Sequence, residues 1–328
     1  MRVGIIDIGS NSIKLLIAES GSSLAMRYET TWETRIGTGM GKTKPYITRE
    51  AMHAAQEAVS ALMAEAEEYE VEQFCLVTTA AVREASNREA FVELIQEATG
   101  ERLRVLTGDE EAAYIAYGIM SDPVLSTFDE MCLIDLGGGS LEAIYVADRE
   151  VRKKVSLPLG AVRLSEDLLR NSAMPMRSEE MRAITRAVQE AFQGSGFEFP
   201  KRGVVLAGSG GALTIARRIR TAWLGRSMDS IGNKLSLNFL EYLFLELASL
   251  TQKERSRIPH LPPERADIMP TALLVLITVA GIARQKSYLH SMYNLRYGIA
   301  HSIHQHYLDT GEVDAESGPP FQAPSTQP

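Results

Sequence analysis

The chain alternates between short apolar runs and longer segments in which apolar residues recur every three or four positions. Short apolar runs bounded by turn residues are typical of buried strands, and the longer period is typical of amphipathic helices. The runs predict strands at residues 3–6, 13–18, 24–33, 74–77, 103–105, 131–134, 142–146, 151–157 and 204–206. The longer period predicts a helix from about Thr48 and helices at 87–99, 179–192, 213–220, 235–250 and 271–283. Strands that alternate with helices predict the α/β class.

Two hairpins in this pattern resemble each other. The first turns through Asp7-Ile8-Gly9-Ser10-Asn11-Ser12, and the second turns through Asp135-Leu136-Gly137-Gly138-Gly139-Ser140. Each hairpin therefore has a strand, an Asp, a turn of small residues and a second strand. Two copies of this unit predict a duplicated fold with a ligand held between the copies.

The triple-glycine turn suits a phosphate group. Glycine permits positive φ and lets a ligand approach the backbone, and successive amide N–H groups can converge on an anion. Asp135 before the turn and Glu142 after it supply the oxygen ligands that Mg²⁺ prefers. If only one such hairpin were present, the alternative interpretation would be that its glycines serve only to make the turn.

Further charged positions are candidates for the same chemistry. Arg83 follows strand 74–77, at the strand end where open α/β sheets place their ligands, although a single Arg there is usually a surface residue. Glu110 and Glu111 fall in the first turn of a helix, with Asp109 as the expected cap. The helix dipole by itself favours acidic residues there. In the functional interpretation, one of the two carboxylates faces the phosphate site and orients or deprotonates water.

Three other motifs carry less weight. The turn at 207–213 is rich in glycine and precedes a helix, so it could offer N–H groups to an anion. The stretch 34–43 lacks the spacing of a Walker A motif, and we interpret it as a flexible surface loop. His301, His304 and His306 are interpreted as exposed helix residues, because the third does not share the face of the other two.

Composition narrows the function classes. The 328 residues suffice for two domains. The net charge of −8 argues against a general nucleic-acid binder, but a polyanionic substrate can still be held locally. Cys75 and Cys132 lie in apolar runs and are expected to be reduced core residues rather than a disulfide.

Targeting and membrane signals are not visible in the sequence. The most apolar later run, 271–283, is shorter than the ~20 residues that a bilayer requires. We therefore expect a cytoplasmic protein with neither a nucleic-acid nor a membrane partner. Residues 313–328 are rich in Pro, Ser, Gln and Gly and predict a disordered tail.

Together the motifs resemble those of the exopolyphosphatase / guanosine pentaphosphate phosphohydrolase (Ppx/GppA phosphatase) family. Besides the two turns, the similarity includes residues 79–85, 108–112, 159–164 and 265–267, and it extends to about residue 305. This family is similar in fold to actin, sugar kinases and the ATPase domain of the 70-kDa chaperones.

The resemblance therefore implies two ribonuclease-H-like lobes with a cleft between them. The first lobe is expected at 1–124 and the second at 125–297. The last helix, at about 298–311, is expected to return to the first lobe.

The resemblance also implies roles for individual residues. It implies Glu111 as the base for the attacking water, Arg83 as a phosphate ligand, and Glu142 and Asp135 near water or Mg²⁺. We assign Asp7 to the metal as well, and we expect Mg²⁺ or Mn²⁺ as the cofactor. The implied phosphate-binding residues are Gly9, Ser10, Asn11, Ser12, Gly137, Gly138, Gly139, Ser140, Gly208, Ser209 and Gly211. A positioned water, a carboxylate and nearby positive charge are what hydrolysis of a terminal phosphoanhydride requires.

The chain departs from the family pattern at three positions. Leu141 stands where the family often has Thr, and Thr271 and Asn294 stand where it usually has Gly. These departures concern local packing more than the chemistry.

The favoured function is hydrolysis of the terminal phosphoanhydride of inorganic polyphosphate. The same reaction on guanosine pentaphosphate or another nucleoside polyphosphate is the close alternative, and the sequence does not separate the two. An ATP-dependent phosphotransferase of the sugar or acetate kinase type, and a nucleotide-switched protein such as actin, are more distant alternatives. The resemblance also makes a homodimer possible.

Overall fold

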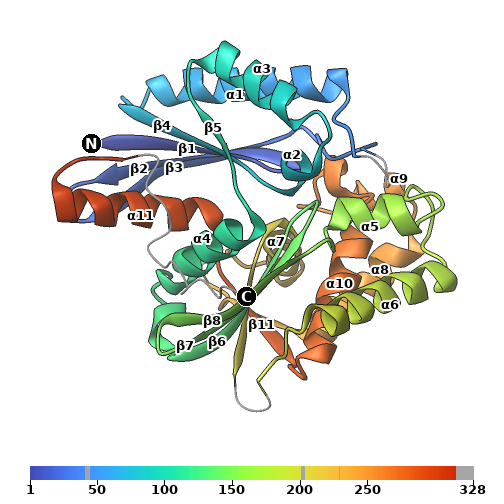
Figure 1. Ribbon diagram of the computed structural model, residues 1–328. Helices are drawn as coiled ribbons and strands as arrows, with labels where there is room; N and C mark the ends of the chain where they lie inside the picture. Colours follow the sequence, from blue (N-terminus) through green and yellow to red (C-terminus); the bar gives the residue numbers. More distant parts are fainter. Residues whose placement is uncertain (41–44, 201–203, 229, 315–328) are drawn as a thin grey trace. The chain divides into compact units, whose positions relative to one another are not determined.

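The structure is a computed structural model that describes residues 1–40, 45–200, 204–228 and 230–314 (Figure 1). Its contacts divide the chain into two compact units. The first contains residues 1–123 and the chain from Tyr293 onward, and the second contains residues 124–292. The predicted disordered tail lies almost wholly outside the described residues.

The first unit is a five-stranded sheet with helices on both faces. Its strand order is β3-β2-β1-β4-β5, in which β1 is antiparallel to β2 and parallel to β4. Helices α1 and α3 lie over one face and α11 over the other (Figure 1). The strands are β1 (Arg2–Ile8), β2 (Ser12–Ser20), β3 (Leu24–Glu33), β4 (Gln73–Thr78) and β5 (Leu103–Val105). The helices are α1 (Arg49–Glu67), α2 (Ala80–Glu84), α3 (Arg88–Thr99), α4 (Gly108–Met120) and α11 (Leu295–Thr310).

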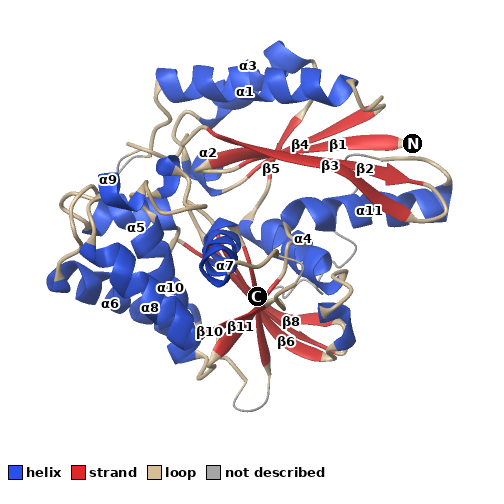
Figure 2. Ribbon diagram, turned by 180° about the vertical axis from the view of Figure 1, so that it is seen from behind, coloured by secondary structure: helices blue, strands red, loops and turns tan. Residues whose placement is uncertain are grey.

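The second unit repeats the start of this topology. Its six-stranded sheet has the order β10-β11-β9-β6-β7-β8, with β6 antiparallel to β7 and parallel to β9. The strands are β6 (Glu130–Leu136), β7 (Leu141–Ala147), β8 (Glu150–Leu157), β9 (Val205–Ser209), β10 (Lys234–Ser236) and β11 (Ser287–His290). The helices, shown in blue in Figure 2, are η1 (Leu125–Thr127), α5 (Ala161–Leu168), α6 (Ser178–Ser195), α7 (Gly211–Leu224), α8 (Leu237–Ser249), α9 (Gln252–Arg255), η2 (Pro263–Arg265) and α10 (Met269–Ile282).

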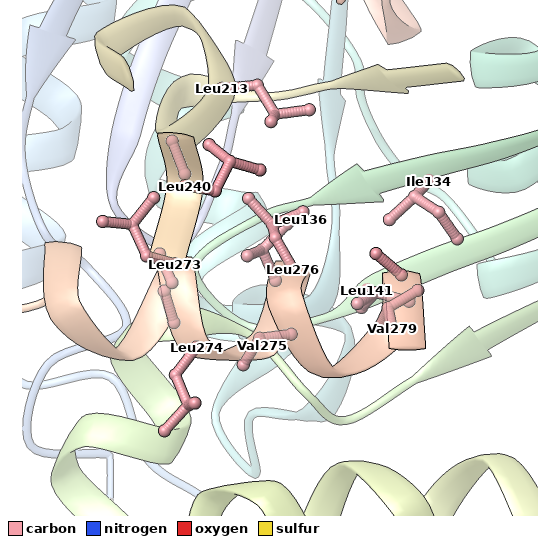
Figure 3. Close-up of a cluster of buried hydrophobic side chains, with 14 of the residues drawn as sticks. Ile134, Leu136, Leu141, Leu213, Leu240, Leu273, Leu274, Val275, Leu276 and Val279 are labelled. Atoms are coloured by element: carbon pink, nitrogen blue, oxygen red, sulfur yellow. The ribbon is translucent and has the colours of Figure 1, made fainter. Parts of the chain in front are cut away.

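Helix α10 forms the centre of the core of the second unit. It is apolar on all sides, as expected for a helix buried among other elements rather than one that faces water. Figure 3 shows Leu273, Val275 and Leu276 gathered with Leu136 and Leu141 of the second hairpin. The hairpin that carries the triple-glycine turn is therefore anchored on a packed apolar layer. None of the helices within the described residues has the length and apolarity needed to cross a membrane.

The structure corrects several local predictions. Helix α2 and strands β10 and β11 were not predicted; β10 overlaps the start of the helix predicted at 235–250, and the five residues of α2 are too few to show a helical period. Helix α4 is capped by Thr107, not by Asp109. Cys75 and Cys132 are buried and form no disulfide, as predicted, and burial raises the pKa of Cys132 to about 12.

The prediction of exposed histidines on α11 was wrong. His301, His304 and His306 are all half-buried. The His301 ring meets Tyr117 edge-on, and His304 Nδ1 lies 2.7 Å from Ser20 Oγ. In the described part of the chain, no group of three or more His, Cys, Asp or Glu side chains could hold a metal ion by itself.

Two of the departures from the family pattern have local structural roles. Asn294 has an extended φ of −148°, so its position does not require glycine, and its side chain accepts from the Arg296 N–H at the start of α11. The Thr271 hydroxyl lies 2.8 Å from the Ser165 hydroxyl and accepts its hydrogen bond inside the core. Each substituted side chain therefore makes a hydrogen bond of its own.

Candidate active site

The two hairpin turns have the same geometry. The Gly9 N–H donates to the Ser12 carbonyl at 3.1 Å, and the Gly137 N–H donates to the Ser140 carbonyl at 3.0 Å. The strands on either side pair in the same register: Asp7 is opposite Lys14, and Asp135 is opposite Glu142. The duplication that the sequence predicted is therefore present at the level of individual hydrogen bonds.

The second turn is held from one side by the start of α5. The Gly137 carbonyl accepts from the Ala161 N–H at 3.0 Å, and the Gly138 carbonyl accepts from Val162 at 3.0 Å. The Gly139 carbonyl accepts from Arg163 Nε at 2.9 Å.

The amides of this turn are left for another partner. Within the described residues, the N–H groups of Gly138, Gly139 and Ser140 make no hydrogen bond. Consecutive amides of this kind are what an anion-binding nest requires.

The first turn is held in the same manner by residues 34–37. Its Asn11 carbonyl accepts from the N–H groups of Thr34 and Arg35, and its Ser10 carbonyl accepts from Gly37 at 2.8 Å. The Ser10 and Asn11 amides make no hydrogen bond among the residues that the structure describes. The interpretation of 34–43 as a surface loop thus needs correction, because its first residues support the turn; residues 41–43 lie outside the described chain.

Polar oxygens are buried beside the first turn. Asp7 is 6% exposed, its Oδ2 lies 3.7 Å from Lys14 Nζ, and its Oδ1 has no hydrogen-bond partner among the described residues. Asn11 donates from Nδ2 to Glu33 Oε2 at 2.5 Å, which fixes the amide orientation and leaves Oδ1 as a buried acceptor. A buried oxygen without a donor is costly unless a cation, a water molecule or a ligand satisfies it.

An ion pair joins the short helix α2 to the start of α4. Arg83 Nη1 donates to Glu111 Oε2 at 2.8 Å and to the Leu106 carbonyl at 2.9 Å. The neighbouring Glu110 instead completes a capping box with Thr107. Glu110 therefore stabilises the helix end, while Glu111 is turned inward and is only 6% exposed.

Two carboxylates stand across from each other on the second hairpin. Glu142 is 1% exposed, and its Oε1 accepts from the Ser156 hydroxyl at 2.7 Å. Asp135 accepts from the hydroxyl of Ser209 at the end of β9. Mg²⁺ keeps several waters and takes one or two protein carboxylates, so the chemistry of this oxygen pair suits such an ion.

The third glycine-rich turn contains glycines with different roles. A Cβ at Gly208 would lie 2.4 Å from Leu213 Cδ1, so this glycine is needed for packing. Gly210 has a φ of +97°, and a Cβ at Gly211 would lie 1.8 Å from Arg265 Nη1. A guanidinium therefore lies against the first residue of α7.

Sequence reasoning missed three residues that lie against the candidate residues. The predicted site residues did not include Arg265, Ser156 or Lys14. Arg265 lies in the segment 265–267 that resembles the family, but its local sequence does not indicate its contact with Gly211. Lys14 could have been found from the hairpin pattern, since it stands at the position of Glu142 in the other copy.

A sequence profile of the Ppx/GppA phosphatase family matches residues 16–306. The chain belongs to the Ppx/GppA phosphatase family. Membership confirms the expected enzyme class, a hydrolase that acts on phosphoanhydrides. Exopolyphosphatase 2 of Mycobacterium tuberculosis is 28% identical over 298 residues, which cover 87% of this chain and 92% of that protein.

Solved structures agree with the family assignment at the level of the fold. A crystal structure of an exopolyphosphatase from Cytophaga hutchinsonii aligns with a TM-score of 0.83 at 24% identity, covering 96% of this chain and 99% of that one. The Aquifex aeolicus member of the Ppx/GppA family aligns with a TM-score of 0.75 at 23% identity, covering 95% and 99%. The predicted α/β fold class with two ribonuclease-H-like lobes is confirmed.

Proposed function

We propose that this protein is an exopolyphosphatase, which hydrolyses the terminal phosphoanhydride of inorganic polyphosphate and releases phosphate. The observation that carries the proposal is the pair of similar turns, each with carbonyls held by a neighbouring segment and with consecutive amides that make no hydrogen bond within the described residues. Such turns suit phosphoryl groups. The family assignment and the name of the M. tuberculosis relative support the same substrate class.

Glu111 is the proposed general base. Its carboxylate takes a proton from water as the water oxygen attacks the terminal phosphorus, and the bond from that phosphorus to the bridging oxygen breaks. The shortened chain leaves with the bridging oxygen and its negative charge. Arg83 orients the carboxylate through the 2.8 Å ion pair and adds positive charge near the developing oxyanions.

Asp135, Glu142 and Asp7 are the proposed residues for a divalent cation. A bound Mg²⁺ or Mn²⁺ would neutralise charge on the phosphoryl oxygens. The Ser156 hydroxyl holds Glu142 in place, and the Ser209 hydroxyl does the same for Asp135. The cation, the cytoplasmic location and a homodimer are parts of this proposal.

Guanosine pentaphosphate is the alternative substrate, with the same mechanism at its terminal phosphoanhydride. The turns and the ion pair address phosphoryl groups, which both substrates carry. The backbone contacts at the turns contain no feature that selects a nucleoside.

Phosphate release, measured side by side from polyphosphate, guanosine pentaphosphate and ATP with Mg²⁺, tests the proposal. We expect release from polyphosphate at the highest kcat/KM. Faster release from guanosine pentaphosphate would favour the alternative. Phosphate transfer that requires ATP and an acceptor would instead identify a phosphotransferase, and no release from any of the three would reject the proposed function.

A further inference from the structure

His290 ends strand β11 and is almost completely buried, with 1% of the residue exposed. It pairs in parallel register with Gly208 of β9, and the next residue, Ser291, donates its N–H to the Gly208 carbonyl at 2.9 Å. The histidine thus lies next to the third glycine-rich turn. Figure 2 shows β11 and α7 as separate elements. The His290 side chain on β11 contacts Thr214 on α7.

Two hydrogen bonds connect this histidine to the turn. His290 Nε2 lies 3.1 Å from the Thr214 hydroxyl on α7. The same hydroxyl donates to the Gly210 carbonyl at 3.1 Å. The other ring nitrogen, Nδ1, is buried and has no hydrogen-bond partner among the described residues.

These contacts select one tautomer of the neutral ring. A hydroxyl has a single proton, and Thr214 uses it for the Gly210 carbonyl. Nε2 must then carry the ring proton and donate it to Thr214. The opposite tautomer would leave a buried N–H at Nδ1 without an acceptor, which costs more than a bare lone pair. Burial, together with the nearby Arg217 and Arg218, lowers the pKa of His290 to about 3, so the ring is neutral.

We propose that His290 is a positioning residue for the hydrolase, which fixes the Gly210–Gly211 turn through Thr214. Gly210 has little freedom to shift. A Cβ on it would lie 2.7 Å from the Leu136 carbonyl and 3.2 Å from Asp135 Oδ1. If this turn shifts, it therefore moves against the Asp135 carboxylate. It also displaces the guanidinium of Arg265, which lies beside Gly211. The inference rests on the proposed function for its catalytic consequence, but not for the tautomer.

A double-mutant cycle tests the path through Thr214. His290→Leu and Thr214→Val each remove one hydrogen-bonding group from the path between His290 and Gly210. We expect each variant to lower kcat for phosphate release about tenfold, since small displacements of binding groups have effects of this size or larger. If His290 acts through Thr214, the double variant is no worse than Thr214→Val alone. Multiplication of the two losses would overturn the inference. So would unchanged kcat and KM in both single variants.

Two matched variants separate positioning from general stability. Thr278→Val removes a buried hydroxyl that donates to the Leu274 carbonyl within α10, so it lowers the melting temperature without lowering kcat. His290→Gln offers an amide N–H in place of Nε2–H, and we expect it to recover at least half of the lost kcat. Loss of kcat in Thr278→Val equal to that in Thr214→Val would contradict a specific role.

The tautomer is measured without any activity. In ¹⁵N-labelled full-length protein, the His290 ring should show Nε2 protonated and Nδ1 unprotonated at pH 7. An Nδ1–H ring would refute the assignment even in a fully active enzyme. If wild-type protein releases no phosphate from any substrate while the ring shows Nε2–H, the proposed function is rejected. The hydrogen bonds from His290 through Thr214 to Gly210 are then still supported.

Discussion

Arg83 donates from a single nitrogen, Nη1, to both Glu111 Oε2 at 2.8 Å and the Leu106 carbonyl at 2.9 Å. This contact fixes a buried carboxylate in the first turn of α4, next to Glu110, which completes the helix cap and lies 3.8 Å from Arg104. Two adjacent acidic residues thus have separate tasks, and the pair offers a matched test.

Glu111→Gln keeps the shape of the side chain and an oxygen acceptor for Arg83, but it removes the proton acceptor. We expect kcat for phosphate release to fall by about 10²–10⁴-fold, the usual contribution of a general base. The melting temperature should stay near that of the wild type. Glu110→Gln is the control, because glutamine also completes a capping box. Equal kcat values for the two variants would reject the assigned role of Glu111.

Arg83→Lys tests the guanidinium rather than the charge. A lysine ammonium is a point charge on a flexible stem, so it lacks the rigid guanidinium that places Nη1 between Glu111 and the Leu106 carbonyl. We expect kcat/KM to fall at least about tenfold, or ~1.4 kcal/mol of transition-state binding. Steady-state kinetics of Arg83→Lys and of Arg88→Lys, a change at an exposed arginine of α3, make the comparison. Identical kinetics in the two variants would show that a positive charge at position 83 is enough for activity.

Much of the fold was predictable because its signals are local. The two hairpins each contain an Asp, small turn residues and apolar strands within about fifteen positions, so their duplication is visible in the sequence. Strand β3 was predicted with the bounds that the structure has. The position of Glu111 in the first turn of α4 was predictable, because a helix start fixes which residues fall in that turn.

The remaining features depend on contacts that a linear pattern does not encode. Ser156 reaches Glu142 only because β8 pairs with β7 in one particular register, with a shift between Tyr145 and Val146. Thr34 and Gly37 support the first turn because the pairing of β3 with β2 brings the end of β3 back beside it. The His290 contact to Thr214 joins positions 76 residues apart. Such relationships follow from tertiary packing, which overrides local preference.

Glu142→Gln and chelation test the divalent cation. We expect EDTA to abolish phosphate release and Mg²⁺ to restore it. Glu142→Gln should raise the Mg²⁺ concentration for half-maximal activity by about tenfold or more, because a neutral amide is a weaker ligand for a hard cation than a carboxylate. Mg²⁺ titrations of this variant and of Glu150→Gln, at an exposed position on β8, provide the measurement. Full activity in EDTA would exclude a divalent cation from the reaction.

Gly160→Ala tests whether the shape of the second turn matters. A Cβ at this position would lie 2.2 Å from the Gly138 carbonyl oxygen, so either α5 or the triple-glycine turn must move. We expect a lower melting temperature and a loss of kcat/KM of about tenfold or more. Gly194→Ala in α6 has open space around its new methyl group and should stabilise the protein by about 0.5–1 kcal/mol without any change in kinetics. Normal kinetics in Gly160→Ala would separate the turn from catalysis.

Stability should fall as the solution becomes acidic, and His301, like His290, contributes to this fall. Burial, with His304 nearby, lowers the pKa of His301 to about 4, whereas an unfolded histidine titrates near 6.5. Below pH 6.5 the unfolded chain therefore binds a proton that the folded chain excludes. The proton uptake of His301 then lowers the free energy of unfolding towards pH 4, with an upper limit of ~1.4 kcal/mol per pH unit. We expect a smaller decrease than this limit, because the ring is only half-buried.

His301→Phe removes this titration while keeping an aromatic ring against Tyr117. Urea unfolding at pH 7.5 and pH 5.0 measures the difference. We expect the variant to lose less stability than the wild type between these two pH values, and we expect His306→Phe, on the same helix, to behave like the wild type. Since folded and unfolded states must differ in proton uptake for stability to depend on pH, an equal loss in His301→Phe and the wild type would mean that His301 has the same pKa in both states.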